Sequence, residues 1–112
     1  GNANFFAFKK DGSIIRWGYD NKVIPENINS NLSNNPNIAI YTDMNDKYCI
    51  LKKDGSIYSD IPTDNPDYFV ALPTNVNDDA STNPVVAVYT NYGLYCALKK
   101  MEMLSFGVEL VI

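Results

Sequence analysis

The side chains that most often carry out catalysis are scarce in this chain. Its 112 residues include no histidine, a single arginine, Arg16, and two cysteines, Cys49 and Cys96. Without histidine there can be no His general base, no Ser-His-Asp or Cys-His arrangement and no His-containing zinc site. The two cysteines occupy the same place in two copies of a repeat, so we interpret them as small buried hydrophobes rather than as a disulfide or a thiol site.

Carboxylates are more numerous, and the net charge is −4. They gather in three predicted loops, at Asp43/Asp46, Asp60/Asp64/Asp67 and Asp78/Asp79. None of these has the spacing of a calcium loop, and nothing selects a pair for glycoside hydrolysis. One arginine cannot hold a sialidase substrate, and no basic patch suits nucleic acid. We therefore predict a protein that is not an enzyme, uses no cofactor or metal and binds no nucleic acid.

Aromatic side chains are the best binding candidates. Those at predicted strand ends or turns, where interface aromatics often lie, are Trp17, Tyr19, Tyr58, Tyr68 and Tyr92. For Trp17 the alternative is packing between repeats. The tyrosines that recur with the repeat are predicted to be structural.

These residues are positioned by a repeated hairpin. The stretch FFAFKKDGSIIRWG at Phe5–Gly18 recurs as YCILKKDGSIYSDI at Tyr48–Ile61, and a third copy begins as YCALKK at Tyr95–Lys100. In each full copy Asp-Gly suits a tight turn between two apolar runs. A second block, NPNIAIY and then NPVVAVY, also recurs, and the period is 43–47 residues.

The pattern predicts an all-β fold of antiparallel, propeller-type blades with about 2–3 repeats. In Tyr48–Leu51, Tyr48 and Ile50 point one way and Cys49 and Leu51 the other, so a sheet covered on both faces is expected. We place repeat 1 at about 5–47, repeat 2 at about 48–94 and a partial repeat 3 at 95–112. Strands are predicted at 5–9, 13–17, 23–25, 38–42, 48–52, 56–59, 68–72, 85–90 and 94–99.

The motif resembles the repeat of the regulator of chromosome condensation family, closest to its bacterial branch with short blades. The matching residues are Phe8–Ile14, Leu51–Ile57 and Ala97–Lys100. The Trp-Gly of the motif is present only in the first copy, as Trp17-Gly18, and the second copy departs from the motif with Ser59-Asp60 in its place. The resemblance implies a propeller of about seven blades, of which this chain would form an incomplete part. Family members include a nucleotide-exchange factor that binds chromatin, inhibitors of β-lactamase and effector proteins.

After Lys100 the repeat pattern stops, and the chain reads MEMLSFGVELVI. Loss of one base in the codons of Lys99-Lys100 would explain this tail, because a shifted frame can encode DGDVIFWGGVGY, the missing half of the hairpin. The alternative is a divergent natural end strand. The DNA around these lysines decides between them.

The function that we expect is non-catalytic protein–protein binding through loops at the blade ends, with an unidentified protein partner. An incomplete propeller exposes blade faces and strand edges, so we also expect self-association, with Leu104–Ile112 forming an added strand. A carbohydrate-binding module and a decayed gene product without a preserved role are the alternatives. No signal or membrane-spanning segment is visible, and the native compartment stays open because a leader could have been removed.

Overall fold

The computed structural model describes residues 4–19, 22–42, 47–60, 69–70, 76–91 and 94–108. These residues form an all-β fold in which every strand pairing is antiparallel. The elements are β1 (Asn4–Phe8), β2 (Ile14–Gly18), the 3₁₀ helix η1 (Glu26–Asn29), β3 (Asn37–Thr42), β4 (Tyr48–Lys52), β5 (Ile57–Ser59), β6 (Phe69–Val70), β7 (Val85–Asn91), β8 (Leu94–Lys99) and β9 (Met103–Val108). Within these ranges no helix is long and apolar enough to cross a membrane.

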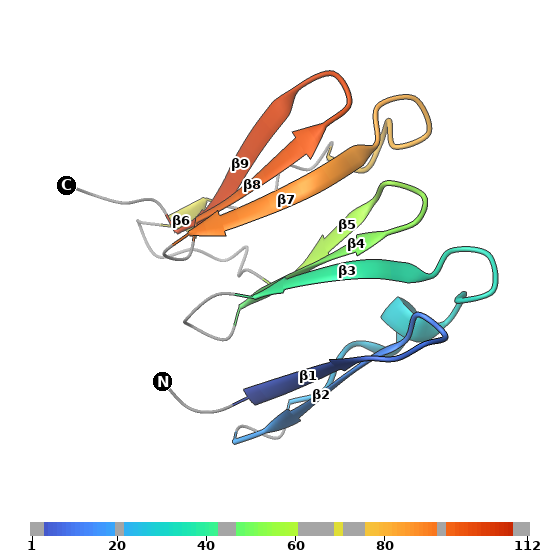
Figure 1. Ribbon diagram of the computed structural model, residues 1–112. Helices are drawn as coiled ribbons and strands as arrows, with labels where there is room; N and C mark the ends of the chain where they lie inside the picture. The colour runs from blue at the N-terminus through green and yellow to red at the C-terminus, as the bar shows by residue number, and fades with distance from the viewer. Residues whose placement is uncertain are drawn as a thin grey trace.

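The strands form three separate sheets, which we call the first, second and third sheet in chain order. The first is the hairpin β1-β2, the second has the order β3-β4-β5, and the third has the order β6-β9-β8-β7 (Figure 1). Each sheet is centred on one copy of the predicted hairpin. The strand before each Tyr-Cys copy, β3 or β7, pairs with the hairpin that follows it, so the sheets begin earlier than the repeats 48–94 and 95–112.

The Asp-Gly turns form as expected in the first two sheets. Gly12 and Gly55 have φ of +87° and +85°, a conformation in which glycine has no Cβ clash. In the first turn, Asp11 Oδ1 accepts hydrogen bonds from the backbone N (2.9 Å) and the Oγ (2.6 Å) of Ser13. The aspartate therefore fixes the turn, which is a structural role.

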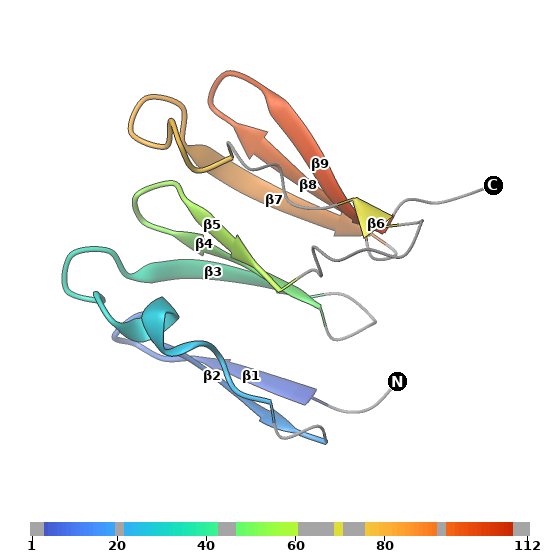
Figure 2. The ribbon, with the colours of Figure 1, turned by 180° about the vertical axis from the view of Figure 1, so that it is seen from behind.

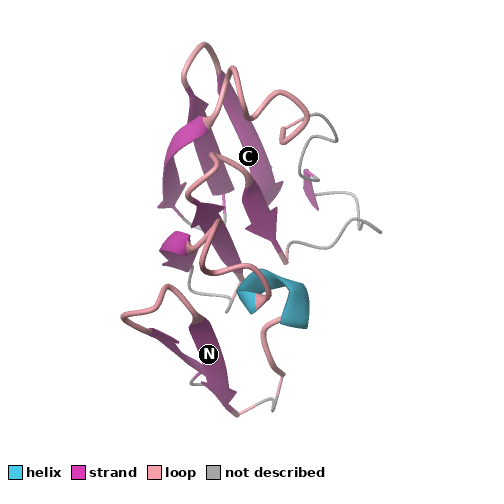
Figure 3. Ribbon diagram, turned by 90° about the vertical axis from the view of Figure 1, so that its right-hand side faces the viewer, coloured by secondary structure: helices cyan, strands magenta, loops and turns pink. Residues whose placement is uncertain are grey.

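The three sheets are stacked in chain order, with their hairpin turns on the same side of the molecule (Figures 1 and 2). A view from the side shows the second sheet between the other two (Figure 3). One face of the second sheet contributes Tyr48 and Ile50 to a cluster shared with the first sheet. The opposite face contributes Cys49 and Leu51 to a cluster shared with the third. The prediction that this sheet is covered on both faces is confirmed.

One predicted strand is wrong. Val23–Pro25 is not paired into any sheet. Pro25 instead precedes η1, and its fixed φ of −55° suits the start of a helical turn. Ile24 is buried against the first two sheets while Val23 is exposed, so the segment acts as a packed connection.

The divergent tail forms a strand. β9 pairs with β8, with Ala97 opposite Leu104, and it also pairs with β6. Its turn is one residue shorter than the others, because Lys99 N donates to Glu102 O (2.7 Å) whereas Lys52 N donates to Ser56 O (3.0 Å). The predicted strand Leu104–Ile112 is thus found as Met103–Val108, and its last four residues lie outside the described residues. The base-loss hypothesis stays a prediction.

Candidate functional site

The first sheet carries the exposed aromatic residues that the sequence singled out. Trp17 lies at the end of β2, is 49% exposed and stacks on Phe5 of β1 with ring centroids 5.6 Å apart. Tyr19 follows the strand and is 71% exposed. Both side chains are therefore accessible to a partner, and Trp17 does not pack between two sheets here.

The other three candidates lie elsewhere. Tyr58 is half-buried, packs against the cluster between the first and second sheets and lies near Tyr48, with ring centroids 6.2 Å apart. Burial raises the pKa of its phenol. Its role is structural. Tyr68 and Tyr92 lie outside the described residues.

Trp17 belongs to a wider apolar surface, which we call the amino-terminal end face. Pairing places Phe5 opposite Trp17 and Ala7 opposite Ile15. Phe6 and Ile14, their neighbours along the strands, point toward the second sheet. Because successive side chains of a strand point to opposite faces, the four side chains of these two pairs point away from the second sheet. Three of the four are about half exposed: Phe5, Ile15 and Trp17.

A second surface, the carboxy-terminal end face, lies on the far side of the third sheet. Val88 and Ala97 are buried against the second sheet, so their neighbours along β7 and β8 face away from it. These are Tyr89, paired with Cys96, and Ala87, paired with Leu98. Tyr89 is 59% exposed, and the other three are only partly covered.

Between the sheets, two equivalent asparagines attach each connecting loop to the preceding hairpin. Asn29 donates from Nδ2 to Ile14 O (2.9 Å) and accepts from Ile14 N (3.0 Å). Asn77 does the same with Ile57 at 2.8 Å for both bonds. Each amide thus replaces a missing strand partner and satisfies a backbone pair.

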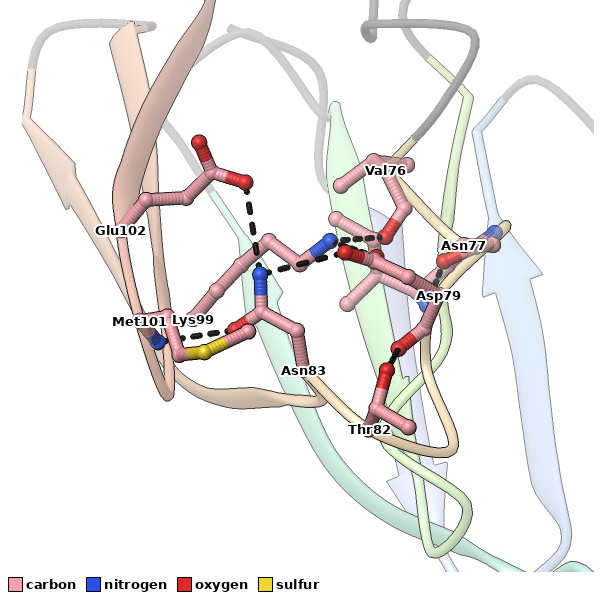
Figure 4. A network of polar contacts seen from close by, with 9 residues as sticks. Val76, Asn77, Asp79, Thr82, Asn83, Lys99, Met101 and Glu102 are labelled. Carbon is pink, nitrogen blue, oxygen red and sulfur yellow. Dashed lines mark hydrogen bonds and ion pairs between the residues drawn. The ribbon is translucent and has the colours of Figure 1, made fainter.

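Two lysines complete these junctions from the next sheet. Lys52 donates from Nζ to Ile28 O (3.0 Å) and to Asn37 Oδ1 (2.9 Å), and burial lowers its pKa. Lys99, with 1% of its side chain exposed, donates to Val76 O (3.0 Å) and forms an ion pair with Asp79 (Figure 4). Buried lysines can be catalytic, but here the bonds of each lysine go to the connecting segment before its sheet or, for Lys52, also to Asn37 at the start of β3, so both lysines hold structure in place.

Two asparagines that each precede a proline, Asn35 and Asn83, also attach a connecting loop to a hairpin turn. Asn35 Oδ1 accepts from Asp54 N (2.9 Å), and Asn83 Oδ1 accepts from Met101 N (2.8 Å) (Figure 4). The sequence analysis did not predict these contacts for any of the asparagines or lysines. A signal was available, since Asn29 and Asn77 each lie seven residues before the proline of the recurring Asn-Pro block.

The two cysteines differ in burial: Cys49 is buried as predicted, whereas Cys96 is only partly buried, because no described element covers its face of the third sheet. Both cysteines are free. The pKa of the Cys49 thiol is raised to about 12, mainly by burial and to a smaller extent by the negative charge of the nearby Asp60. Its thiol is therefore protonated and unreactive at neutral pH, as expected for a buried hydrophobe. Among the described residues no group of three metal-ligating side chains comes together.

A shallow depression on η1 is lined by Glu26, Asn27, Asn29 and Ser30. The Asn29 amide is already committed to the backbone of Ile14, and Ser30 Oγ donates to Asn27 O (3.0 Å). We do not assign a ligand to it.

Comparisons with protein-family models, with curated proteins and with solved structures found no match for this chain.

Proposed function

We propose that this chain is a non-catalytic protein-binding module made of propeller-type blades similar to those of the regulator of chromosome condensation family. On this proposal each sheet is one blade, and the stack is part of a propeller. Three sheets joined by equivalent loops, lysines and asparagines support the repeat. Partner binding takes place on the apolar end faces and on exposed aromatic residues next to them, such as Tyr19.

One observation carries the proposal. Residues that are buried in the second sheet have counterparts that are exposed on the outer sheets. Tyr48 is 4% exposed, whereas Phe5, which holds the same place in the first hairpin, is 52% exposed. Contiguous exposed apolar surface of this kind marks interaction sites, because its burial is favourable by about 25 cal/mol per Å². Self-association of the chain is the first interaction that we expect.

Sedimentation velocity of the unmodified chain over a dilution series at micromolar concentrations tests the proposal. We expect species larger than the monomer, with a weight-average sedimentation coefficient that rises with concentration. A single monomeric species at every concentration contradicts the proposal, because the end faces would then be stable in water.

A further inference from the structure

The two junctions inside the molecule follow one rule. We call the face that a sheet turns toward the next sheet its forward face, and the opposite one its backward face. In the first junction, the forward face of the first sheet (Phe6, Ile14) meets the backward face of the second (Tyr48, Ile50). In the second junction, the forward face of the second sheet (Cys49, Leu51, Ile57) meets the backward face of the third (Tyr95, Ala97).

The repeat makes these faces equivalent residue by residue. Phe6, Cys49 and Cys96 hold the same place in their hairpins and lie on forward faces. The preceding residues in the three hairpins are all aromatic and lie on backward faces: Phe5, Tyr48 and Tyr95. A forward face meets a backward face in both junctions, and the described residues show no junction between two faces of the same kind.

The surfaces left uncovered are of opposite kinds. The amino-terminal end face is a backward face, and the carboxy-terminal end face is a forward face. Tyr41, the counterpart of Tyr89 in the second sheet, packs against the cluster shared with the third sheet. Cys49, the counterpart of Cys96, is 0% exposed. Each end face therefore has the residues of a surface that is covered elsewhere in the same molecule.

We propose that a second copy of this chain docks head to tail, with the amino-terminal end face of one copy on the carboxy-terminal end face of another. The interface repeats the internal junctions, with Phe5 in the place of Tyr48 or Tyr95 and Tyr89 in the place of Tyr41. Such a contact is heterologous, so it continues to further copies until a ring closes or a filament forms. This inference rests on the self-association in the proposed function and adds its geometry.

A complementation experiment tests the geometry. Phe5→Asp disables the amino-terminal end face, and Tyr89→Asp disables the carboxy-terminal end face. Both residues are more than half exposed, so each variant is expected to keep the circular-dichroism spectrum of the parent. Ile38→Asp, at an exposed position on the second sheet, is the matched control and should assemble like the parent.

In sedimentation velocity, each end-face variant alone should be monomeric at concentrations where the parent associates. An equimolar mixture should form a one-to-one dimer, because each variant keeps the face that the other has lost. The apparent Kd for self-association of each single variant should be at least about tenfold higher than that of the parent, because a charge then lies at the centre of an apolar interface. Ile15→Lys and Leu98→Lys, one on each face, repeat the test should an aspartate variant lose its fold.

The contrary results separate the two proposals. A parent that associates while Tyr89→Asp associates equally well overturns the head-to-tail geometry and leaves self-association standing. Folded single variants that fail to combine in the mixture also overturn the geometry. A parent that is monomeric throughout overturns both proposals.

Discussion

The second sheet and the two outer sheets contain nearly the same residues in different surroundings. In the second sheet, Ile50 is 0% exposed because the first sheet covers the face to which it points. In the first sheet, Ile15 lies on a face that no other described element covers and is 48% exposed. The difference shows that apolar residues on both faces of each hairpin are suited to a continuing stack. The predictions below measure the difference between covered and uncovered faces.

The largest effect is expected in the covered sheet. Ile50→Ala should lower the free energy of unfolding by about 2–5 kcal/mol, because it leaves a cavity between two sheets. The matched control is Ile15→Ala, which should cost less than about 1 kcal/mol since the side chain is half exposed. Both values come from urea unfolding at a concentration where the chain is monomeric. Equal costs would mean that the second sheet is not covered as described.

The second effect concerns the close approach of a turn to the next sheet. In Gly55→Ala, a Cβ at this position would lie 2.1 Å from Pro84 Cβ, in a residue with φ of +85°. Backbone strain alone costs about 1–3 kcal/mol, so the unfolding midpoint should fall clearly. Gly12→Ala is the milder comparison, because its nearest contact, Pro36 Cβ, is 2.8 Å away. A Gly12 variant that is the less stable of the two would contradict this packing.

The third effect concerns the buried lysine of the second junction. Lys99→Met should lower the free energy of unfolding by about 1–3 kcal/mol, because the carbonyl of Val76 loses a buried donor. Lys9 has the same place in the first sheet and is exposed, so Lys9→Met should be close to neutral. Similar losses in both variants would show that the lysine contributes through charge alone and not through the junction.

The smallest effect is a pH dependence. The hydrogen bond from Lys99 lowers the pKa of Asp79 below its ordinary value of 3.8. A carboxyl with a lower pKa in the folded than in the unfolded chain stabilises the fold above the unfolded value, and this stabilisation is lost as pH falls through the folded value. Unfolding of Asp79→Asn should therefore vary less with pH below about pH 4 than that of the parent. An unchanged acid profile would exclude the ion pair.

Much of the fold follows from the repeat in the sequence. The strand Tyr48–Lys52 lies where it was predicted, and the opposite directions of Tyr48 and Cys49 follow from period-2 alternation. Val23–Pro25 was predicted wrongly, because a short apolar run before proline fits a strand and a packed connection equally well. Its burial is decided by the neighbouring sheet, which local sequence does not specify.

The candidate site was predictable only in part. Trp17 and Tyr19 are exposed, but exposure of Trp17 depends on whether a further sheet covers the first one, and no local pattern reports this. Asn29 was missed because its partners are the backbone groups of Ile14, which leave no mark in the sequence. Lys99 was missed because its partners, the carbonyl of Val76 and the carboxylate of Asp79, lie about 20 residues away in a loop whose position the local sequence does not specify. Only alignment of the copies could have located them.

The two cysteines allow the most direct test of the difference between covered and uncovered faces. They hold equivalent places, but Cys49 is buried between the second and third sheets while Cys96 lies on the carboxy-terminal end face. The measurement is the rate of alkylation of each thiol under native conditions, followed by peptide mass spectrometry over a range of protein concentrations. We predict that Cys96 reacts much faster than Cys49 in dilute solution and becomes protected as the concentration rises. Equal rates for the two thiols, or a Cys96 rate that does not change with concentration, would contradict the account.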